Sequence, residues 1–247
     1  MTATRLAATA AVLGAAVEWG PALTSVAPAR RAALPLLSGL SARPHVALTY
    51  DDGPDPASTP LFLDLLARHG VTATFFLLGE HVVRHRELTL EMSAAGHELA
   101  VHGWDHQCLA WKAPGRLTGE LRRSRHAIED LTGRLVHWYR PPYGVMTGRG
   151  LRAAHRAGLR TVLWSAWGRD WTRGATPDSV TRTVSAALEP GGTVLLHDTD
   201  RTSAPGSWRT TLAASERLLA EWAAGGLEVG PLREHWSNQH EGVTATS

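Results

Sequence analysis

The sequence predicts an α/β fold, a distorted (β/α) barrel with about seven parallel strands. Between His45 and Val229, short apolar runs alternate with helical stretches and leave little room for hairpins. This alternation favours a parallel sheet with right-handed crossovers. Polar residues follow almost every predicted strand, as in barrels whose sites are built from the carboxyl ends of several strands. An open doubly wound sheet is the alternative fold.

The predicted strands are short runs of branched or aromatic apolar residues, which suit a buried sheet. In chain order they are Val46–Tyr50, Val71–Leu78, Glu98–His102, Leu135–Tyr139, Arg160–Ser165, Thr193–His197 and Leu227–Val229. The first run is stopped by Gly53-Pro54, a turn sequence. No G-x-G-x-x-G follows this strand and no P-loop occurs, so no nucleotide site is predicted.

The predicted helices carry apolar residues at helical spacing, and turn residues set their limits. In chain order they are Thr59–His69, His85–Ala95, Gly115–Leu131, Thr147–Ala157, Asp178–Leu188 and Ser207–Ala224. Glycines end the first four of them, namely Gly70, Gly96, Gly133 and Gly158. Pro177 stands at the first-turn position of the fifth, where its missing N–H costs nothing.

Composition indicates one ordinary domain. The chain has 247 residues, of which 43% are hydrophobic, enough for a large core. A net charge of +2 and the absence of a long basic run speak against a nucleic-acid partner. Cys108 is the only cysteine, so no intrachain disulfide can form. The 10 tryptophans can pack in a core or offer aromatic surfaces to sugar rings. The composition implies no stable protein partner.

The two ends of the chain lie outside the predicted domain, which spans 41–236. Residues 1–40 read as a leader, because Arg5 precedes an alanine-rich apolar run that ends before Glu18. This resembles a signal peptide with a cleavage site near Ser25-Val26-Ala27, or an envelope anchor, and predicts a secreted or cell-envelope protein. The run is shorter than the roughly 20 apolar residues of a membrane-spanning helix, and a surface-packed helix is the alternative. Residues 237–247 read as a polar tail.

Asp51 and Asp52 stand together at the end of the first strand. Adjacent carboxylates in a buried site repel each other unless a cation or a shared proton offsets the repulsion. The pair therefore indicates a metal or acid–base site. A solvated Asp-Asp-Gly-Pro turn is the alternative for this stretch taken alone.

His102 and His106 are spaced four residues apart directly after a predicted strand. This spacing puts both imidazoles on one side of a helical turn, where they can hold one cation. With 13 histidines in the chain, chance pairs are expected. His81 and His85 have the same spacing without nearby carboxylate motifs, and we interpret them as surface residues.

Three further strand ends carry polar residues. Arg140 opens a stretch with two prolines that runs through Tyr143, and such a rigid loop can aim a backbone N–H at a target. Asp170 and Trp171 follow the strand at Arg160, and His197 ends the strand at Thr193. Each is weak alone, because Arg140 suits a surface and His197 suits a core. Together with the carboxylate pair and the histidine pair, these residues all fall at the same end of one predicted sheet.

These residues resemble the motifs of a known family, the polysaccharide deacetylases with the NodB homology domain (carbohydrate esterase family 4). The resemblance covers about residues 45–232 and lies in five ordered motifs. They are Thr49 to Pro54, His102 to His106, Arg140 to Gly144, Asp170-Trp171 and Leu195 to His197. Tyr50 stands where the family usually has Phe, and Trp167 stands where it usually has a further Asp.

The resemblance implies a role for each matching residue. Asp52, His102 and His106 are expected to bind Zn2+ or another divalent ion such as Co2+. The other expected roles are a general base (Asp51), a general acid (His197), an oxyanion donor (backbone N–H of Tyr143), two residues that orient base and acid (Arg140, Asp170) and two walls of the acetyl pocket (Trp171, Leu195). The substitution at Trp167 bears on how His197 and the far wall are arranged.

The function that follows is metal-dependent removal of N-acetyl groups from an amino-sugar polymer, of the chitin-oligomer or peptidoglycan type. The partner would be an N-acetylated glycan. One alternative is hydrolysis of a non-peptide C–N bond in a small molecule or a decorated natural product, which a closed pocket would favour. A second alternative, a sugar-binding protein without activity, would be favoured by loss of Asp51, His102 or His197, and all three are present.

Overall fold

A computed structural model of the chain describes residues 14, 18, 30–31, 34–109 and 112–236. Its centre is one sheet in which every pairing is parallel. The strands are β1 (His45–Asp51), β2 (Thr74–Leu77), β3 (Glu98–Val101), β4 (Trp138–Tyr139), β5 (Arg160–Thr161), β6 (Ala166–Trp167), β7 (Thr193–His197) and β8 (Glu228–Gly230). The path across the sheet is β5-β4-β3-β2-β1-β7-β6, with β8 paired to β1.

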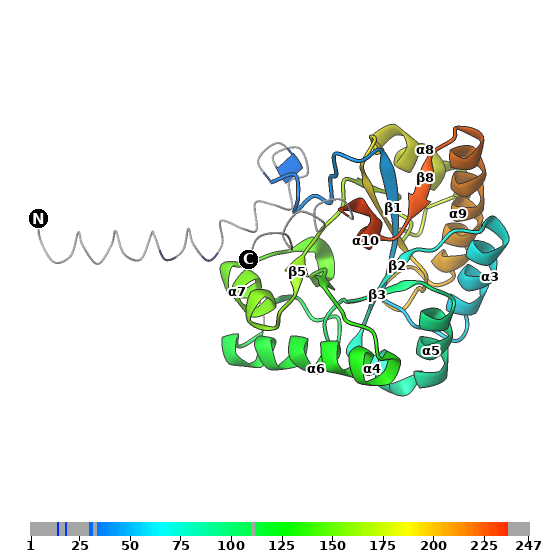
Figure 1. Cartoon of the computed structure of the whole chain (residues 1–247). Helices are drawn as coiled ribbons and strands as arrows, with labels where there is room; N and C mark the ends of the chain where they lie inside the picture. Colours follow the sequence, from blue (N-terminus) through cyan, green and yellow to red (C-terminus); the bar gives the residue numbers. More distant parts are fainter. Residues whose placement is uncertain (1–13, 15–17, 19–29, 32–33, 110–111, 237–247) are drawn as a thin grey trace, which may run out of the picture.

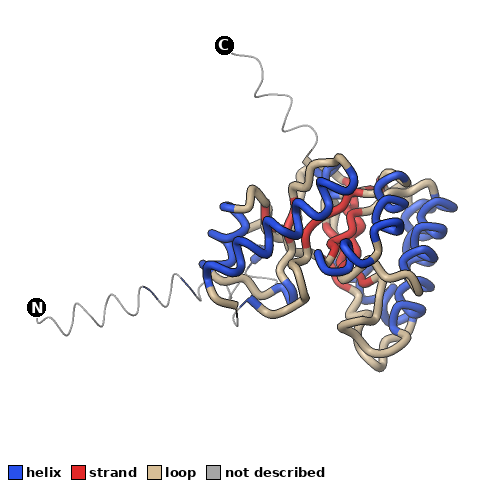
Figure 2. Tube along the Cα trace, turned by 90° about the horizontal axis from the view of Figure 1, so that it is seen from below, coloured by secondary structure: helices blue, strands red, loops and turns tan. Residues whose placement is uncertain are grey.

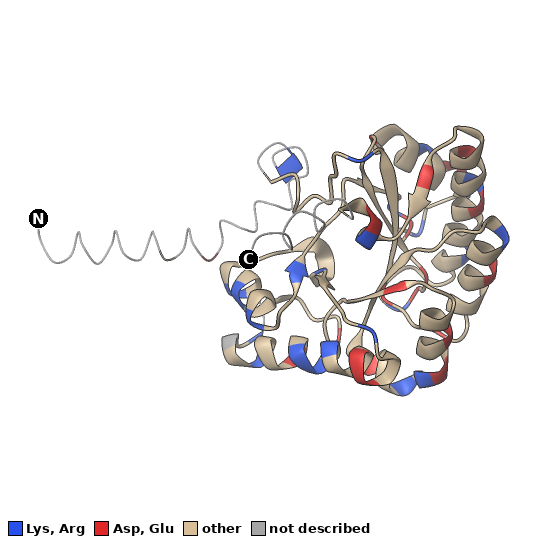
Figure 3. Cartoon of the chain, in the orientation of Figure 1, with Lys and Arg blue, Asp and Glu red and all other residues tan. Residues whose placement is uncertain are grey.

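Helices surround this sheet as an outer layer (Figures 1 and 2). They are α3 (Thr59–His69), α4 (Gly79–Arg84), α5 (Arg86–Ala94), α6 (Pro114–Thr132), α7 (Gly148–Arg156), α8 (Pro177–Ala187) and α9 (Ser207–Ala224). The short α10 (Leu232–His235) lies at the centre instead, where Leu232 joins the same small core as Ala47, and a 3-10 turn covers Pro142–Gly144. Most charged side chains belong to these outer helices, and both signs are mixed on them (Figure 3). The Lys and Arg positions seen in this view do not gather on one side (Figure 3).

The sheet curls into a barrel that is open between β5 and β6, its two end strands. Within the described residues no pairing joins β5 to β6. Between them, the N–H of Leu163 donates to the carbonyl of Leu37 at 2.7 Å, so this backbone bonds the N-terminal segment instead of extending a strand. The predicted distorted (β/α) barrel is confirmed.

Alternation along β1 separates two hydrophobic cores. Val46, Leu48 and Tyr50 pack in the large core beneath the helices, whereas Ala47 belongs to a smaller core within the barrel. Because successive side chains in a strand point to opposite faces, Asp51 shares the inner face with Ala47. The last residue of β1 therefore presents its carboxylate to the carboxyl end of the barrel.

Most predicted elements are present, three of them with the predicted bounds: α3, α9 and β7. The predicted strand at Val71–Leu78 is shorter, and so are those at Leu135–Tyr139 and Arg160–Ser165. The prediction for Arg160–Ser165 was wrong in extent, because the chain leaves the sheet at Val162 and re-enters it at β6. The short α4 and α10 were not predicted.

The interpretation of His81 as a surface residue was wrong. His81 is only 4% exposed, because α4 turns its side chain inward together with Val82. Its ring stacks on that of His85 with centroids 6.3 Å apart. Burial, followed by the charge of Arg201, lowers the pKa of His81 to about 4. Burial therefore favours the neutral form of His81.

The predicted leader and tail lie mostly outside the described residues, so the boundaries of the 41–236 domain stay predictions. Of the predicted leader, Gly39 is described, and its carbonyl accepts from Thr193 Oγ1 at 2.7 Å. Arg30 is buried and donates to the carbonyl of Trp164 at 2.6 Å. Among the described helices, none is both long and apolar enough to cross a bilayer.

Candidate metal centre and active site

Three ligand atoms converge at the carboxyl end of the barrel. Asp52 follows β1, and its Oδ1 lies 3.3 Å from His102 Nε2 and 3.2 Å from His106 Nε2. Within the described residues, Asp52, His102 and His106 form the one group of three whose donor atoms lie within 4.8 Å of one another. Asp52 Oδ1 is buried and accepts no hydrogen bond. Two imidazoles and an orphaned carboxylate oxygen fit a divalent cation.

The outer contacts of this group orient the ligand atoms. His102 Nδ1 donates to the carbonyl of Arg140 at 2.9 Å, which leaves Nε2 as the free nitrogen facing Asp52. The hydroxyl of Thr202 donates to the other oxygen of Asp52. Thr202 therefore holds Oδ2 of Asp52, and Oδ1 is available for a cation.

The protonation states of Asp52 and His106 also suit the binding of a cation. Burial would raise the pKa of Asp52, but the adjacent His102, with the charges of His197 and His106, holds that pKa well below its usual range. Burial, and then the charge of His102, lower the pKa of His106 to about 4. A charged carboxylate and a neutral imidazole are the forms that coordinate metal.

Asp51 is held by a buried ion pair. Arg140, which is fully buried, donates from Nη1 to Asp51 Oδ1 at 2.7 Å and to Thr49 Oγ1 at 2.8 Å. Its Nη2 donates to the carbonyl of Leu163 at 2.9 Å. This anchorage occupies Oδ1 of Asp51, whose Oδ2 lies 3.8 Å from His102 Nε2. Asp51 is thus oriented with one oxygen toward the candidate metal ligands, which suits a general base.

His197 pairs with a buried carboxylate on the other side of the cavity. Its Nδ1 lies 3.1 Å from Asp170 Oδ1, and its backbone N–H donates to Asp170 Oδ2 at 2.8 Å. Thr211 Oγ1 donates to the same Oδ2 at 2.9 Å. Burial alone would lower the pKa of His197, but the charge and hydrogen bond of Asp170, with Asp52 and Asp51, raise it to about 10. A protonated imidazole held in this way suits a general acid.

Strand register brings the expected base and the expected acid together. In the β1–β7 pair, Asp51 stands opposite His197.

The backbone of the site has a positive φ at three residues with side chains: Asp52 (81°), His106 (52°) and Tyr143 (61°). Such backbone conformations are costly for residues with side chains and are found where function needs them. The ring of Tyr143 packs edge-on to that of His106, with centroids 4.7 Å apart.

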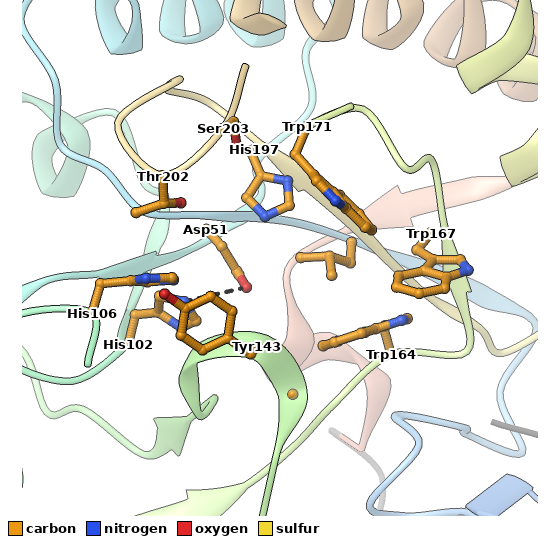
Figure 4. A pocket seen from close by; sticks show the side chains of 12 residues that line it. Asp51, His102, His106, Tyr143, Trp164, Trp167, Trp171, His197, Thr202 and Ser203 are labelled. Carbon is orange, nitrogen blue, oxygen red and sulfur yellow. Dashed lines mark ion pairs between the residues drawn. The ribbon is translucent and has the colours of Figure 1, made fainter. Parts of the chain in front are cut away.

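These groups surround a cavity of about 230 Å3 (Figure 4). Its lining residues are Asp51, His102, His106, Tyr143, Gly144, Trp164, Trp167, Trp171, Leu195, His197, Thr202 and Ser203. The structure thus brings together all ten residues that the sequence singled out: seven line the cavity, and Asp52, Arg140 and Asp170 bond to residues that do.

Sequence reasoning missed Thr202 and Trp164. Thr202 lies in the loop after β7, outside any motif, and only the fold brings its hydroxyl to Asp52. Trp164 precedes β6 and could have been noticed as part of a tryptophan series with Trp167 and Trp171. The cavity thus combines an acid–base pair, a cation site and an apolar wall. This combination suits hydrolysis of the bond between an acyl carbon and nitrogen.

Comparison with known proteins supports this interpretation. Residues 39–162 match the sequence model of the polysaccharide deacetylases. Over 198 residues the chain is 38% identical to a chitooligosaccharide deacetylase of Bradyrhizobium sp. (strain ANU 289), covering 76% of this chain and 88% of that protein.

Solved structures show the same fold. The Bc1960 peptidoglycan N-acetylglucosamine deacetylase, in complex with 4-naphthalen-1-yl-N-oxidanyl-benzamide, superposes with a TM-score of 0.74 at 29% identity, covering 81% of this chain and 91% of that one. A mutant of BA3943, described as a family 4 carbohydrate esterase pseudoenzyme with restored enzymatic activity, gives a TM-score of 0.70 at 27% identity, covering 78% and 68%.

Proposed function

This chain belongs to the polysaccharide deacetylase family, and we propose that it is a metal-dependent hydrolase that removes N-acetyl groups from amino-sugar polymers. The substrate would be an N-acetylated glycan of the chitooligosaccharide or peptidoglycan type, the two classes named for its relatives. The observation that carries the proposal is the orphaned, buried Oδ1 of Asp52 between two imidazole nitrogens, beside a base–acid pair.

The metal would be held by Asp52, His102 and His106, and Zn2+ or Co2+ suits this ligand set. When bound, such an ion supplies Lewis acidity, which makes water acidic near neutral pH and polarises a carbonyl. Thr202 and the carbonyl of Arg140 keep the ligand atoms in place. Because the pKa of His106 is lowered to about 4, its ring is neutral at neutral pH, and no proton has to leave it before the metal binds.

Asp51 acts as the general base. Its Oδ2 takes the proton of the attacking water while Arg140 holds Oδ1 in place. The oxygen of the water forms a bond to the acetamide carbon, and the carbonyl oxygen becomes an oxyanion. The backbone N–H of Tyr143 donates to that oxyanion, and one such donor is worth roughly 10² to 10³ in rate.

His197 acts as the general acid. Its Nδ1 faces Asp170, so Nε2 is the nitrogen that can reach a substrate. Nε2 donates its proton to the amide nitrogen as the C–N bond breaks, which releases acetate and a free amino sugar. A pKa raised to about 10 keeps this proton in place at neutral pH. Trp171 and Leu195 bound the acyl side of the cavity.

The leader predicted for residues 1–40 is consistent with a secreted or envelope-bound enzyme, because such glycans lie outside the cytoplasm. The test of the function is acetate release from an N-acetylglucosamine oligomer and from peptidoglycan, using chelated protein before and after Zn2+ is returned. Release that depends on added Zn2+ is the expected result. No release from either polymer, with zinc bound, would overturn the proposed activity.

A further inference from the structure

Three tryptophans form one wall of the active-site cavity. The rings of Trp164 and Trp167 have centroids 5.7 Å apart with 29° between their planes, and those of Trp167 and Trp171 are 5.1 Å apart. Trp171 in turn lies 5.5 Å from the ring of His197. This tryptophan wall (Trp164, Trp167 and Trp171) runs from His197 to the side of the cavity away from His102 and His106 (Figure 4).

The tryptophan wall is held in place from behind. A Cβ atom at Gly144 would lie 2.5 Å from Cη2 of Trp164, so the ring of Trp164 rests directly on this backbone. Trp167 stands opposite Leu195 in the β6–β7 register, and the guanidinium of Arg169 lies 5.2 Å from the Trp167 ring. The wall is therefore a formed surface and not a set of loose side chains.

Polar and apolar groups occupy opposite sides of the cavity. The metal ligands His102 and His106, with Thr202, lie on one side, and the tryptophan wall lies on the other (Figure 4). The three rings of the wall are half-buried and keep part of their surface in the cavity. Apolar surface inside a binding cavity favours a ligand that covers it.

The proposed reaction fixes which part of a substrate meets the wall, and this step rests on the proposed function. The reacting carbon carries an oxygen, a nitrogen and an acyl chain. The oxygen belongs with the metal ligands and Tyr143, and the nitrogen belongs with His197. The acyl chain is then directed toward Leu195 and the tryptophan wall. The cavity of about 230 Å3 is many times the roughly 10–15 Å3 of cavity volume that one water needs, so a single methyl group cannot cover all three rings of the wall.

We infer that the tryptophan wall lets this enzyme also remove N-acyl groups longer than acetyl, such as propionyl and butyryl, from amino sugars, and favours them over acetyl. Trp167, in the middle of the series, is the specificity-determining residue. Burying one methylene is worth about 0.8 kcal/mol, or roughly fourfold in kcat/KM. A butyryl group, two methylenes longer than acetyl, is then favoured by about tenfold or more.

The test compares N-acetyl, N-propionyl and N-butyryl glucosamine oligomers of equal length, with amine release measured on zinc-loaded protein. The wild type is expected to give a butyryl-to-acetyl ratio of kcat/KM above one. Trp167→Ala is expected to lower that ratio about fourfold or more, and Trp167→Phe to restore most of it. Trp208→Ala serves as the matched control, because Trp208 is half-buried on α9 and does not line the cavity.

Two results would overturn the inference. One is a wild-type ratio well below one, which would mean that the wall excludes longer chains. The other is an equal loss of kcat/KM for all three substrates in Trp167→Ala, which would assign the wall to stacking on the sugar ring.

A binding measurement separates this inference from the proposed function. Calorimetric titration of the zinc-loaded protein with acetate and with butyrate is expected to show tighter binding of butyrate, by about tenfold, and loss of this difference in Trp167→Ala. Equal affinities would refute the acyl site even if the enzyme releases acetate. Tighter butyrate binding without any amine release would refute the proposed activity and support the acyl site.

Discussion

The contact between Asp170 and His197 gives the sharpest test of the proton-transfer chemistry, through Asp170→Asn. Asparagine has nearly the same shape, so its oxygen can keep the hydrogen bonds from the His197 backbone N–H and from Thr211. Its amide NH2 group then faces His197 Nδ1, 3.1 Å away in the wild type. Nδ1 has to accept, and the ring becomes neutral with its proton on Nε2, where it is a poor acid.

The size of the effect follows from the pKa of His197. Burial lowers that pKa, and the charge and hydrogen bond of Asp170 are the first of the opposing causes that raise it to about 10 from an ordinary value near 6.5. Because the raised pKa keeps the acid form present below about 10, wild-type activity is lost only as the pH rises through that value. In Asp170→Asn the acid form is lost at a much lower pH. A general acid is worth about 10² to 10⁴ in rate, so kcat at pH 7 should fall by at least about 10².

The assay is kcat/KM for an N-acetylglucosamine oligomer from about pH 6 to about pH 11.5, which includes the alkaline limb of the wild type near pH 10, with equal zinc content in each variant. Thr211→Val is the control, since it removes one hydrogen bond to Asp170 but leaves the charge. It should move the alkaline limb by less than about one pH unit. An Asp170→Asn enzyme with the wild-type alkaline limb and near-normal kcat would refute the assignment of His197 as an acid tuned by Asp170.

Further predictions address the base, the metal and stability. Asp51→Asn should keep the metal but lose activity, whereas His102→Ala should lose the metal; near-normal turnover of Asp51→Asn would contradict the assigned base. Thr202→Val should weaken zinc affinity by about tenfold or more in a competition titration, because it releases Oδ2 of Asp52, and an unchanged affinity would remove Thr202 from the site. Burial lowers the pKa of His97 and of His235 to about 4, so the unfolded chain binds more protons below about pH 6.5. The free energy of unfolding of metal-free protein should therefore fall as the pH drops from about 6.5 toward 4, and a urea midpoint that stays flat across this window would contradict it.

The sequence predicted the barrel and the site because both depend on local patterns. The helices α3 and α9 have apolar periodicity and are followed by Gly70 and Gly225, and β7 is a compact branched run. The ten singled-out residues lie next to strand ends, and parallel strands bring their carboxyl ends to one edge. The motifs that follow one another along the chain therefore lie close together in space.

Other features depend on long-range contacts that no local pattern contains. Thr202 reaches Asp52 across 150 positions in the chain, and Leu163 bonds Leu37 where the barrel stays open. His81 was misassigned because its polar neighbours suggest exposure, whereas α4 turns it inward. The positive φ at His106 follows from the need to aim Nε2 at Asp52, a requirement of the assembled site.

In the proposed function, one divalent ion held by Asp52, His102 and His106 makes this chain a deacetylase. The most direct measurement is acetate release from an N-acetylglucosamine oligomer as Zn2+ is titrated into fully chelated protein. We predict activity that rises in proportion to added zinc and levels off at about one ion per chain, and none at any zinc concentration in Asp52→Ala. Full activity in the chelated protein, or activity of Asp52→Ala at the wild-type level, would contradict the account.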